Sequence, residues 1–272
     1  MLYSLPKRLG KLSMVDFAIT VIVPTYNHEA YISEAIESVR RQSLFSVCKV
    51  IVSDDCSADN TVEIARKASD GAANISIRKN PSNVGVMEHY KLLAQLVDTP
   101  YLAILEGDDY WRSPDKLEVQ KSLLESHPSV GLCFSACLVD DEASGTTWHH
   151  PGWPVDRHRV VHLLDMLTSN PIATFSNCFY RAPRFKEVAE KANVKDGYDW
   201  LFNMTIAAKG GALFAARMGT VYRLHSNGTW TKLGSEQKRA KIIKSLAGLK
   251  NNVDEAFGAY IDAAMTRALN DR

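Results

Sequence analysis

The chain has 272 residues, 46% of them hydrophobic, which is enough to bury the core of one large domain or of two closely joined halves. Its 32 basic and 31 acidic residues leave a formal net charge of +1, so no overall field points to nucleic acid as a partner. Five scattered cysteines without a CxxC pair argue against a disulfide framework or a structural zinc site and suit a reducing cytosol.

The first half alternates apolar runs with helical patterns, after a weakly patterned leader at residues 1–17. The expected strands are Ile19–Val23, Val50–Ser53, Ile75–Arg78 and Tyr101–Leu105, and the expected helices lie near Ala30–Gln42, Asp59–Ala68 and Val86–Val97. The strands are continuous apolar runs, as in strands that are covered on both faces. This order predicts an α/β fold with a mainly parallel central sheet, right-handed crossovers and helices on both faces.

The second half is less regular. Ser113-Pro114-Asp115 predicts the start of a helix that runs to about Ser126, with a capping Ser, Pro at the first helical position and an acid in the first turn. Strands are expected at Val130–Val139, Ala173–Tyr180 and Ala212–Tyr222, a loop at His149–Pro154 and a helix near Tyr198–Lys209. Helix is expected from about Ser235, with an apolar stripe of Ile242, Leu246, Leu249, Val253, Phe257 and Tyr260 on one face.

Two of the expected strands end in paired carboxylates. Asp54 and Asp55 follow one of them, and Glu106, Asp108 and Asp109 follow another. Ligands of open α/β sheets bind outside the carboxyl ends of the strands, and Mg²⁺ or Mn²⁺ takes carboxylate oxygens together with substrate phosphates. The acids therefore predict a site for a divalent cation and a nucleoside diphosphate. For Asp59 and Thr61, turn and capping chemistry is an equal alternative.

Two turns add weaker signals. In Pro24-Thr25-Tyr26-Asn27 the proline lacks an N–H and should not continue a central strand, so the turn exposes backbone and a Tyr ring that suits a nucleobase. Asn83-x-Gly85 precedes a helix, where glycine permits either close approach of backbone to a ligand or merely a tight turn. No G-x-G-x-x-G follows the first strand, which disfavours an NAD-dependent dehydrogenase.

The order and spacing of these segments resemble family-2 glycosyltransferases, over roughly residues 18–232. The resemblance rests on Val21–Asn27, Val50–Thr61, Asn83-x-Gly85 and Leu105–Trp111, and Tyr198–Trp200 with Tyr222–His225 and Gly228–Trp230 resembles a bacterial branch. It implies a GT-A fold and an inverting reaction on a nucleotide sugar. The implied organisation is a GT-A domain at 18–232, divided into a nucleotide-binding half (18–111) and an acceptor-binding half (112–232), followed by a C-terminal helical segment at 233–272.

The resemblance also implies roles for single residues in the donor site. Pro24, Thr25, Tyr26 and Asn27 would line the nucleoside pocket, and either Asp54 or Asp55 would accept the pyrimidine N3–H. Asn83 and Gly85 would approach the nucleotide sugar, and Arg78 or Lys79 would neutralise its diphosphate. Asp109 would be the main metal ligand, with Asp108 on the ribose or sugar side and beside the metal. Glu106 stands where many relatives carry Asp. His225 would complete the metal shell or bind phosphate, and Arg223 would clamp phosphate.

The resemblance places the catalytic base in the second half of the chain. An inverting transfer needs a carboxylate that takes the proton of the acceptor hydroxyl. Relatives carry this acid at the start of a helix, where Asp199 with Trp200 fits best and Asp196 is the second candidate. The family's Glu-Asp pair is absent at this point, and either Asp can instead be a helix cap.

The expected function is transfer of a sugar from a UDP-linked donor to a saccharide or lipid-linked saccharide acceptor in surface polysaccharide assembly, assisted by Mn²⁺ or Mg²⁺. A sugar-1-phosphate nucleotidyltransferase and a non-catalytic nucleotide-sugar-binding protein are the alternatives. No run of about 18 apolar residues spans a bilayer. A cytoplasmic location is expected, and a homodimer is left open. Peripheral contact with anionic lipid would use Lys238, Arg239, Lys241, Lys244 and Lys250, although a solvated helix face explains them more simply.

Overall fold

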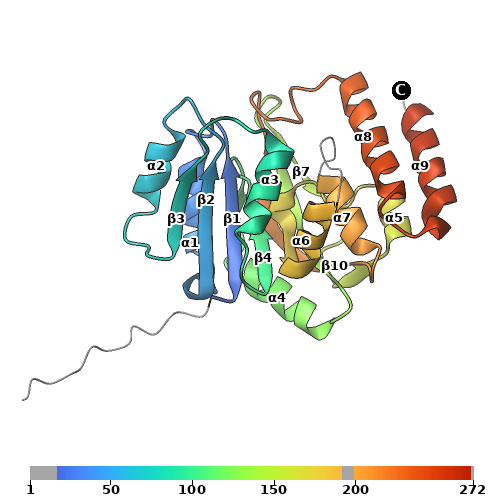
Figure 1. Cartoon of the computed structure of the whole chain (residues 1–272), viewed down its shortest axis with the longest axis horizontal. Coiled ribbons are helices and arrows are strands. Elements are labelled where there is room, and N and C mark those ends of the chain that lie inside the picture. The colour runs from blue at the N-terminus through green and yellow to red at the C-terminus, as the bar shows by residue number, and fades with distance from the viewer. Residues whose placement is uncertain (1–16, 192–198, 271–272) are drawn as a thin grey trace, which may run out of the picture.

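The computed structural model describes residues 17–191 and 199–270. In this part of the chain a ten-stranded sheet runs through the molecule, with helices packed on both of its faces (Figure 1). The strands are β1 (Ile19–Thr25), β2 (Cys48–Asp54), β3 (Ile75–Lys79), β4 (Tyr101–Ile104), β5 (Tyr110–Trp111), β6 (Leu132–Asp141), β7 (Thr146–His150), β8 (Arg159–Val161), β9 (Cys178–Arg181) and β10 (Ala212–Leu224). The helices are α1 (Ile32–Arg40), α2 (Thr61–Ala68), α3 (Val86–Gln95), α4 (Lys116–Ser126), α5 (Leu163–Thr168), α6 (Ala182–Lys191), α7 (Asp199–Ala207), α8 (Ser235–Lys250) and α9 (Gly258–Asn270).

The strand order is β3-β2-β1-β4-β9-β6-β10-β5, with β7 paired to β6 and β8 paired to β10. The first four strands are parallel, as predicted. The second half is mixed, because β9 runs antiparallel between β4 and β6 whereas β6 and β10 are parallel. The α/β architecture with helices on both faces is confirmed, and the parallel arrangement holds for β1 to β4.

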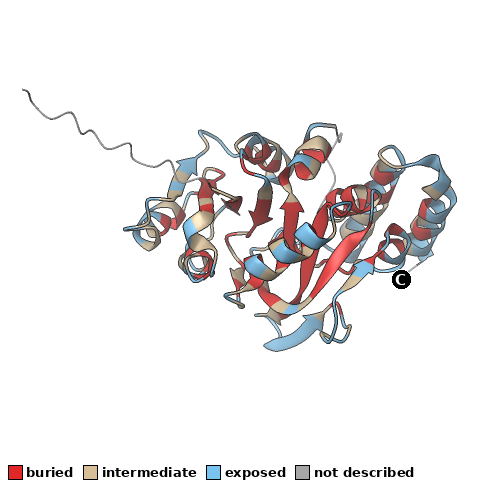
Figure 2. Cartoon of the chain, turned by 90° about the horizontal axis from the view of Figure 1, so that it is seen from below, coloured by how far each residue is buried: buried red, intermediate tan, exposed pale blue. Residues whose placement is uncertain are grey.

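Burial on both faces explains why the strands are continuous apolar runs. Along β1, Ile19, Val21 and Val23 face a core that includes α1 and α4, while Ile22 faces a second core that includes α3, α6 and α7. Successive side chains of a strand point to opposite faces, so a strand covered on both sides needs apolar residues at every position. The buried strands form the centre of the molecule in Figure 2.

Strand β1 continues through Pro24 to Thr25, but there it is paired with β2 alone, so it is not central beyond Pro24, as predicted. The Pro24 ring is tolerated because the pairing of β1 with β4 ends at Ile22 and Ile104. The Pro24 carbonyl accepts a hydrogen bond from Gly107 N on this same side, at 2.9 Å. The missing N–H therefore removes no bond of the sheet, while pairing with β2 continues through Thr25.

The structure corrects several local predictions in the second half. Helix α4 begins at Lys116, and Ser113 does not cap it, because the Ser113 hydroxyl donates to the Asp115 carboxylate instead. The predicted strand at Ala173–Tyr180 begins with a 3-10 turn (Phe175–Asn177) and becomes strand only at Cys178. His149 and His150 belong to β7 rather than to a loop. Strand β8 and helices α5 and α6 were not predicted, because their pairing and packing partners are distant in sequence.

The C-terminal segment forms two helices instead of one continuous apolar stripe. Helix α8 ends at Lys250, and the Asp254 side chain caps a 3-10 turn at Glu255–Phe257 before α9 begins. This break changes the helical phase, so Tyr260 is 55% exposed whereas Leu246 and Leu249 are buried. Both helices contribute to the same core as α7. In residues 17–191 and 199–270, no helix is long and apolar enough to cross a membrane.

Candidate active site

The turn after β1 is held by the loop after β2. Asn27 N donates to Ser57 Oγ at 2.8 Å, and Asn27 Oδ1 accepts from Ala58 N at 2.9 Å. His28 N donates to Thr61 Oγ1 at 2.8 Å. Asn27 therefore fixes the turn by its backbone and its side chain, and Thr61 serves the turn chemistry that was its alternative interpretation. Of the predicted nucleoside-pocket residues, Tyr26 is 45% exposed, whereas Pro24 and Thr25 are buried.

Asp54 and Asp55 organise two neighbouring loops at the ends of β2 and β3. Asp54 accepts bonds from the backbone N–H of Ser57, at 2.8 Å, and from its hydroxyl. Asp55 accepts bonds from Asn80 Nδ2 at 2.8 Å and from Val84 N and Gly85 N at 3.0 Å each. Both residues are almost completely buried. Their carboxylates thus shape the loops between which a ligand would sit.

The Asn83-x-Gly85 segment is a tight turn before α3. Asn83 Oδ1 accepts a bond from Gly85 N at 3.1 Å, and Gly85 has φ = +82°. Only glycine adopts this conformation without strain. A Cβ at Gly85 would meet no atom within 4 Å among the described residues, so the backbone here faces open space. Both of the roles considered for this glycine are therefore compatible with its position.

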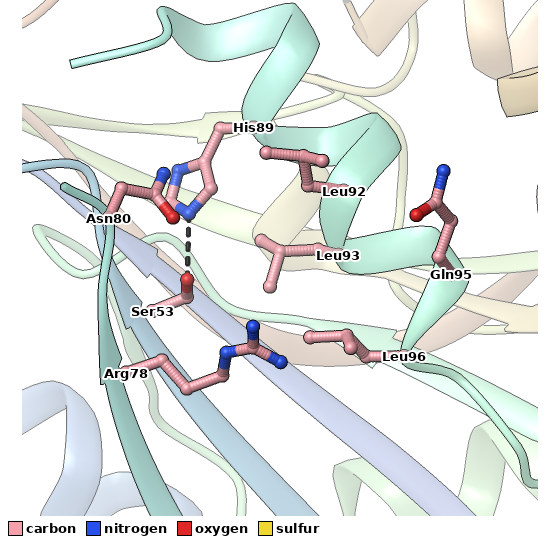
Figure 3. Close-up of a pocket in the computed structure, with 8 residues that line it drawn as sticks. All are labelled: Ser53, Arg78, Asn80, His89, Leu92, Leu93, Gln95 and Leu96. Atoms are coloured by element: carbon pink, nitrogen blue, oxygen red, sulfur yellow. Dashed lines mark hydrogen bonds between the residues drawn. The ribbon is translucent and has the colours of Figure 1, made fainter. Parts of the chain in front are cut away.

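Arg78 and Lys79 have different surroundings. Lys79 Nζ donates to the Ser57 carbonyl at 2.9 Å and so holds the loop after β2. Arg78 lines a cavity of about 120 Å³ beside α3, whose floor contains a bond of 2.8 Å between Ser53 Oγ and His89 Nε2 (Figure 3). Burial lowers the pKa of His89 below its usual value. Among the described residues, neither Arg78 nor Lys79 contacts Glu106, Asp108 or Asp109. Their role toward the diphosphate stays a prediction.

The segment from Glu106 to Asp109, called the acidic tip below, connects β4 to β5, which pairs with β10. Gly107 N is bonded to Pro24 O, and β5, which follows the tip, pairs with Thr220 and Val221 of β10. A Cβ on Gly107 would lie 2.7 Å from Thr25 Oγ1 and 2.9 Å from His28 Nδ1. A side chain at this position would therefore push the tip away from the turn after β1.

Glu106 and Asp109 point into the protein. Asp109 is 0% exposed, and its oxygens accept from Arg223 N at 3.0 Å and from Thr174 Oγ1 at 3.1 Å. Glu106 accepts from Tyr90 OH at 3.0 Å, and its other oxygen lies 2.6 Å from Thr174 Oγ1, whose single proton Glu106 and Asp109 share. Burial and the charge of Asp108 raise the pKa of Glu106 to about 7 and the pKa of Asp109 well above its usual value. Both carboxyl groups are thus hydrogen-bonded to groups inside the protein.

Asp108 is partly accessible to solvent, with 19% of its side chain exposed. Its Oδ2 lies 3.1 Å from His225 Nε2 and 3.5 Å from His28 Nε2. Burial alone would raise the pKa of Asp108, but His28 and the hydrogen bond from His225 outweigh it and hold this pKa below its usual value. His28 was missed in the sequence, where the only signal was its position directly after Asn27.

Arg223 holds the tip instead of standing free. Its guanidinium donates to the Asp108 carbonyl at 2.8 Å, pairs with Glu34, and lies over the rings of Tyr110 and Tyr31. The Tyr31 ring also packs against His225, with ring centroids 4.7 Å apart. Glu34 and Tyr31, which sequence reasoning missed, thus join α1 to the end of β10. The predicted phosphate clamp would require Arg223 to exchange Glu34 for a ligand.

The donor set at the tip fits a divalent cation that binds together with a nucleotide. No group of three or more His, Cys, Asp or Glu side chains in residues 17–191 and 199–270 is arranged to hold a metal ion by itself. Asp108 and His225 nevertheless present one carboxylate and one imidazole side by side, and such cations bind through one or two carboxylates with substrate phosphates completing the shell. Asp109 has no oxygen left without a partner in this arrangement.

Asp199 is the first residue of α7 and is half-buried. Its Oδ1 accepts a bond from Trp200 N at 2.8 Å. Burial, together with the nearby charge of Glu106, raises the pKa of Asp199 to about 8. A carboxylate with a raised pKa is a stronger base than an exposed one once it has lost its proton. The second candidate, Asp196, lies outside the described residues.

Comparison of the sequence with known families and proteins gives consistent matches. The sequence model described as Glycosyl transferase family 2 matches residues 20–189. Uncharacterized proteins of Mycobacterium tuberculosis and Mycobacterium bovis are each 30% identical over 224 residues, which is 81% of this chain and 62% of the relative. The chain thus spans 62% of the length of these curated relatives. A UDP-Glc:alpha-D-GlcNAc-diphosphoundecaprenol beta-1,3-glucosyltransferase of Escherichia coli is 32% identical over 111 residues, 41% of this chain and 42% of the relative.

Solved structures share the fold. TarS of S. aureus, solved with UDP-GlcNAc, superimposes with a TM-score of 0.70 at 19% identity and covers 93% of this chain and 72% of its own. The mannosyltransferase PcManGT of Pyrobaculum calidifontis, solved with GDP-Man and Mn²⁺, gives a TM-score of 0.65 at 17% identity, over 93% of this chain and 73% of its own. At such identities the likeness concerns the fold alone.

Proposed function

The chain belongs to glycosyl transferase family 2, and on this basis we propose that it is an inverting glycosyltransferase that uses a nucleotide-sugar donor. The donor is a UDP-sugar, and the acceptor is a hydroxyl of a saccharide or of a lipid-linked saccharide. The product contributes to surface polysaccharide or lipopolysaccharide, and the reaction takes place in the cytoplasm or at the inner face of the membrane.

The observation that carries this proposal is that the acids of the site have different surroundings. Glu106 and Asp109 are hydrogen-bonded inside the protein, the Asp108 side chain is 19% exposed beside the buried His225, and Asp199 lies on a separate helix. A sugar transfer needs one group on the leaving diphosphate and another on the attacking hydroxyl. Asp108 and Asp199 supply these two groups from different elements.

In the proposed reaction Asp199 accepts the proton of the acceptor hydroxyl. The hydroxyl oxygen forms a bond to the anomeric carbon, while the bond from that carbon to the phosphate oxygen breaks, so the nucleoside diphosphate leaves and the configuration inverts. Asp108 and His225 would hold a divalent cation, Mn²⁺ or Mg²⁺, which when bound neutralises charge on the diphosphate. This assignment moves the main ligand role from Asp109 to Asp108, because the Asp108 side chain is 19% exposed whereas Asp109 is fully buried.

The nucleoside would bind beside the turn after β1. The exposed ring of Tyr26 is suited to stack on a base, and Asp54 or Asp55 would accept the pyrimidine N3–H. What supports UDP is the activity of the Escherichia coli relative and the UDP-GlcNAc bound to TarS, whereas GDP-Man in PcManGT supports a purine nucleotide. The lipid-linked acceptor named for the Escherichia coli relative supports a role in surface polysaccharide assembly.

A donor screen tests the proposal. The purified chain is incubated with UDP-, GDP- and dTDP-sugars, with and without Mn²⁺, and nucleoside diphosphate and pyrophosphate are measured separately. Slow release of UDP from one UDP-sugar, increased by an acceptor saccharide, is expected. Pyrophosphate release would identify a nucleotidyltransferase instead. Tight donor binding without any turnover across all acceptors would identify a binding protein.

A further inference from the structure

We propose that His28 is a positioning residue of the donor site, which fixes the Asp108 carboxylate beside His225, where these two side chains would meet the cation and diphosphate. This inference rests on the proposed function, since it concerns the same site. It assigns a task to a residue whose position in the turn after β1 gave no indication of it.

Two imidazoles share a single oxygen of Asp108. His225 Nε2 is 3.1 Å from Asp108 Oδ2, and His28 Nε2 is 3.5 Å from the same atom. A carboxylate has two oxygens with about four lone-pair sites. Asp108 Oδ1 therefore keeps its acceptor capacity, and the carboxylate is oriented from the side on which the two histidines lie.

The two histidines have different surroundings, since the side chain of His225 is 2% exposed and that of His28 is 17% exposed. His225 lies at the end of β10 against the Tyr31 ring, and its 3.1 Å contact lets it share a cation with Asp108. His28 is fixed through its backbone, because its N–H donates to Thr61 Oγ1 at 2.8 Å and thereby ties it to the start of α2. A ring anchored in this way suits a supporting group that orients a ligand better than a ligand that adjusts to the metal.

The other ring nitrogen of His28 supports the same assignment. His28 Nδ1 is buried against Gly107 and has no hydrogen-bond partner among the described residues. An N–H at Nδ1 would be a buried donor without an acceptor, which is more costly than an unused lone pair. The proton of a neutral ring therefore belongs on Nε2, where it points at Asp108. Gly107 allows this packing, because a Cβ there would lie 2.9 Å from Nδ1.

The turn after β1 is thereby coupled to the acidic tip. Asn27 and His28 are bonded to Ser57 and Thr61, so the loop after β2 sets the position of the turn. Through His28, the turn after β1 then sets the orientation of Asp108. Outer groups that orient a metal-binding carboxylate affect cation affinity by about 10- to 100-fold when they are removed. Loss of the His28 contact should therefore weaken cation binding without removing a ligand.

The experiment compares His28→Phe, which keeps the ring volume without a donor, with His28→Gln, which keeps a donor amide. Mn²⁺ binding in the presence of saturating UDP is measured by isothermal titration calorimetry, and UDP binding is measured separately without metal. His28→Phe should weaken Mn²⁺ binding about 10-fold or more, while His28→Gln should stay within about threefold of the unmodified protein. Without metal, UDP affinity should be the same in all three proteins. His149→Phe, at an exposed histidine of β7, is the matched control.

The outcomes separate this inference from the proposed function. If the unmodified protein binds neither Mn²⁺ nor UDP, the proposed function fails, and the inference with it. If it binds both and His28→Phe binds Mn²⁺ equally well, only the role of His28 is overturned. Equal weakening in His28→Gln and His28→Phe would also overturn it, because the retained donor would then have no effect. Thermal unfolding checks that each variant is folded, and His28→Met replaces His28→Phe if the latter is not.

Discussion

Asp109 Oδ1 accepts a hydrogen bond from the backbone N–H of Arg223 at 3.0 Å, which joins the acidic tip after β4 to the end of β10. Asp109 thereby brings Asp108, in the tip, and His225, two positions beyond Arg223, to the same place. Because Asp109 is buried, it affects the site by holding the acidic tip against β10. Asp108, whose side chain is 19% exposed, is placed to contact a ligand directly.

Substitution of the two neighbouring acids should therefore have different effects. Asp109→Ala leaves the Arg223 N–H buried without an acceptor, which costs about 1–3 kcal/mol in the free energy of unfolding. Asp108→Asn should leave that free energy nearly unchanged while weakening Mn²⁺ binding with UDP about 10-fold or more. Denaturant unfolding and calorimetry measure the two quantities. Equal loss of Mn²⁺ affinity in Asp109→Asn, which keeps the Arg223 bond, would return the main ligand role to Asp109.

Asp199→Asn should remove the base without removing the donor site. We expect kcat to fall about 10²- to 10⁴-fold, because the acceptor hydroxyl loses its proton acceptor. The affinity for the UDP-sugar should not change, since Asp199 lies on a separate helix. Initial rates and donor titrations measure both quantities. Asp156→Asn, at an exposed acid before β8, is the control, and full turnover by Asp199→Asn would exclude it as the base.

The rate should rise with pH. The pKa of Asp199 is raised to about 8 by burial and by Glu106, and the group must lose its proton before it can accept one. Below this pH the carboxyl is mostly protonated, so kcat should increase as pH rises and level off above about pH 8, with the slope of a single ionisation. A pH profile under saturating donor and acceptor measures this. A rate that falls over the same interval would contradict the assignment.

Gly107→Ala should destabilise the protein. The new Cβ would lie 2.7 Å from Thr25 Oγ1 and 2.8 Å from Thr25 Cβ, which are parts of a short, buried side chain that cannot move aside. Such overpacking costs about 1–3 kcal/mol. Denaturant unfolding gives this value, and Gly152→Ala, where a Cβ meets no atom within 4 Å among the described residues, should be nearly neutral. Comparable stability of the two variants would mean that the tip can move freely.

Tyr26→Ala should weaken binding of the nucleotide. Stacking of a base on an aromatic ring is worth about 1–3 kcal/mol, so the Kd for UDP should increase about 5-fold or more. Tyr26→Phe should retain the affinity, because the ring and not the hydroxyl makes the contact. Tyr260→Ala, at an exposed tyrosine of α9, is the control for removal of a surface ring. An unchanged Kd in Tyr26→Ala would place the base elsewhere.

The sequence alone determined the layered architecture and the first four parallel strands, because an apolar run between helical patterns can be buried in few ways. The order and spacing of its sequence segments also indicated the family, and the family model confirmed this. The pattern of apolar residues mispredicted local structure at places where tertiary contacts decide it. The phase break after Lys250 that exposes Tyr260 is one such place, and the 3-10 turn at Phe175–Asn177 is another.

Within the site, the sequence identified which acids gather at the strand ends, and only the tertiary structure decided which of them face inward. Asp108 and Asp109 are adjacent and chemically identical, yet one is held inside by Arg223 N and Thr174 while the other lies between two histidines. Their different positions depend on β10 and on the turn after β1, which are far away in the chain. Neighbouring residues can thus acquire different tasks because a carboxylate's chemistry depends on its distant hydrogen-bond partners and its access to water.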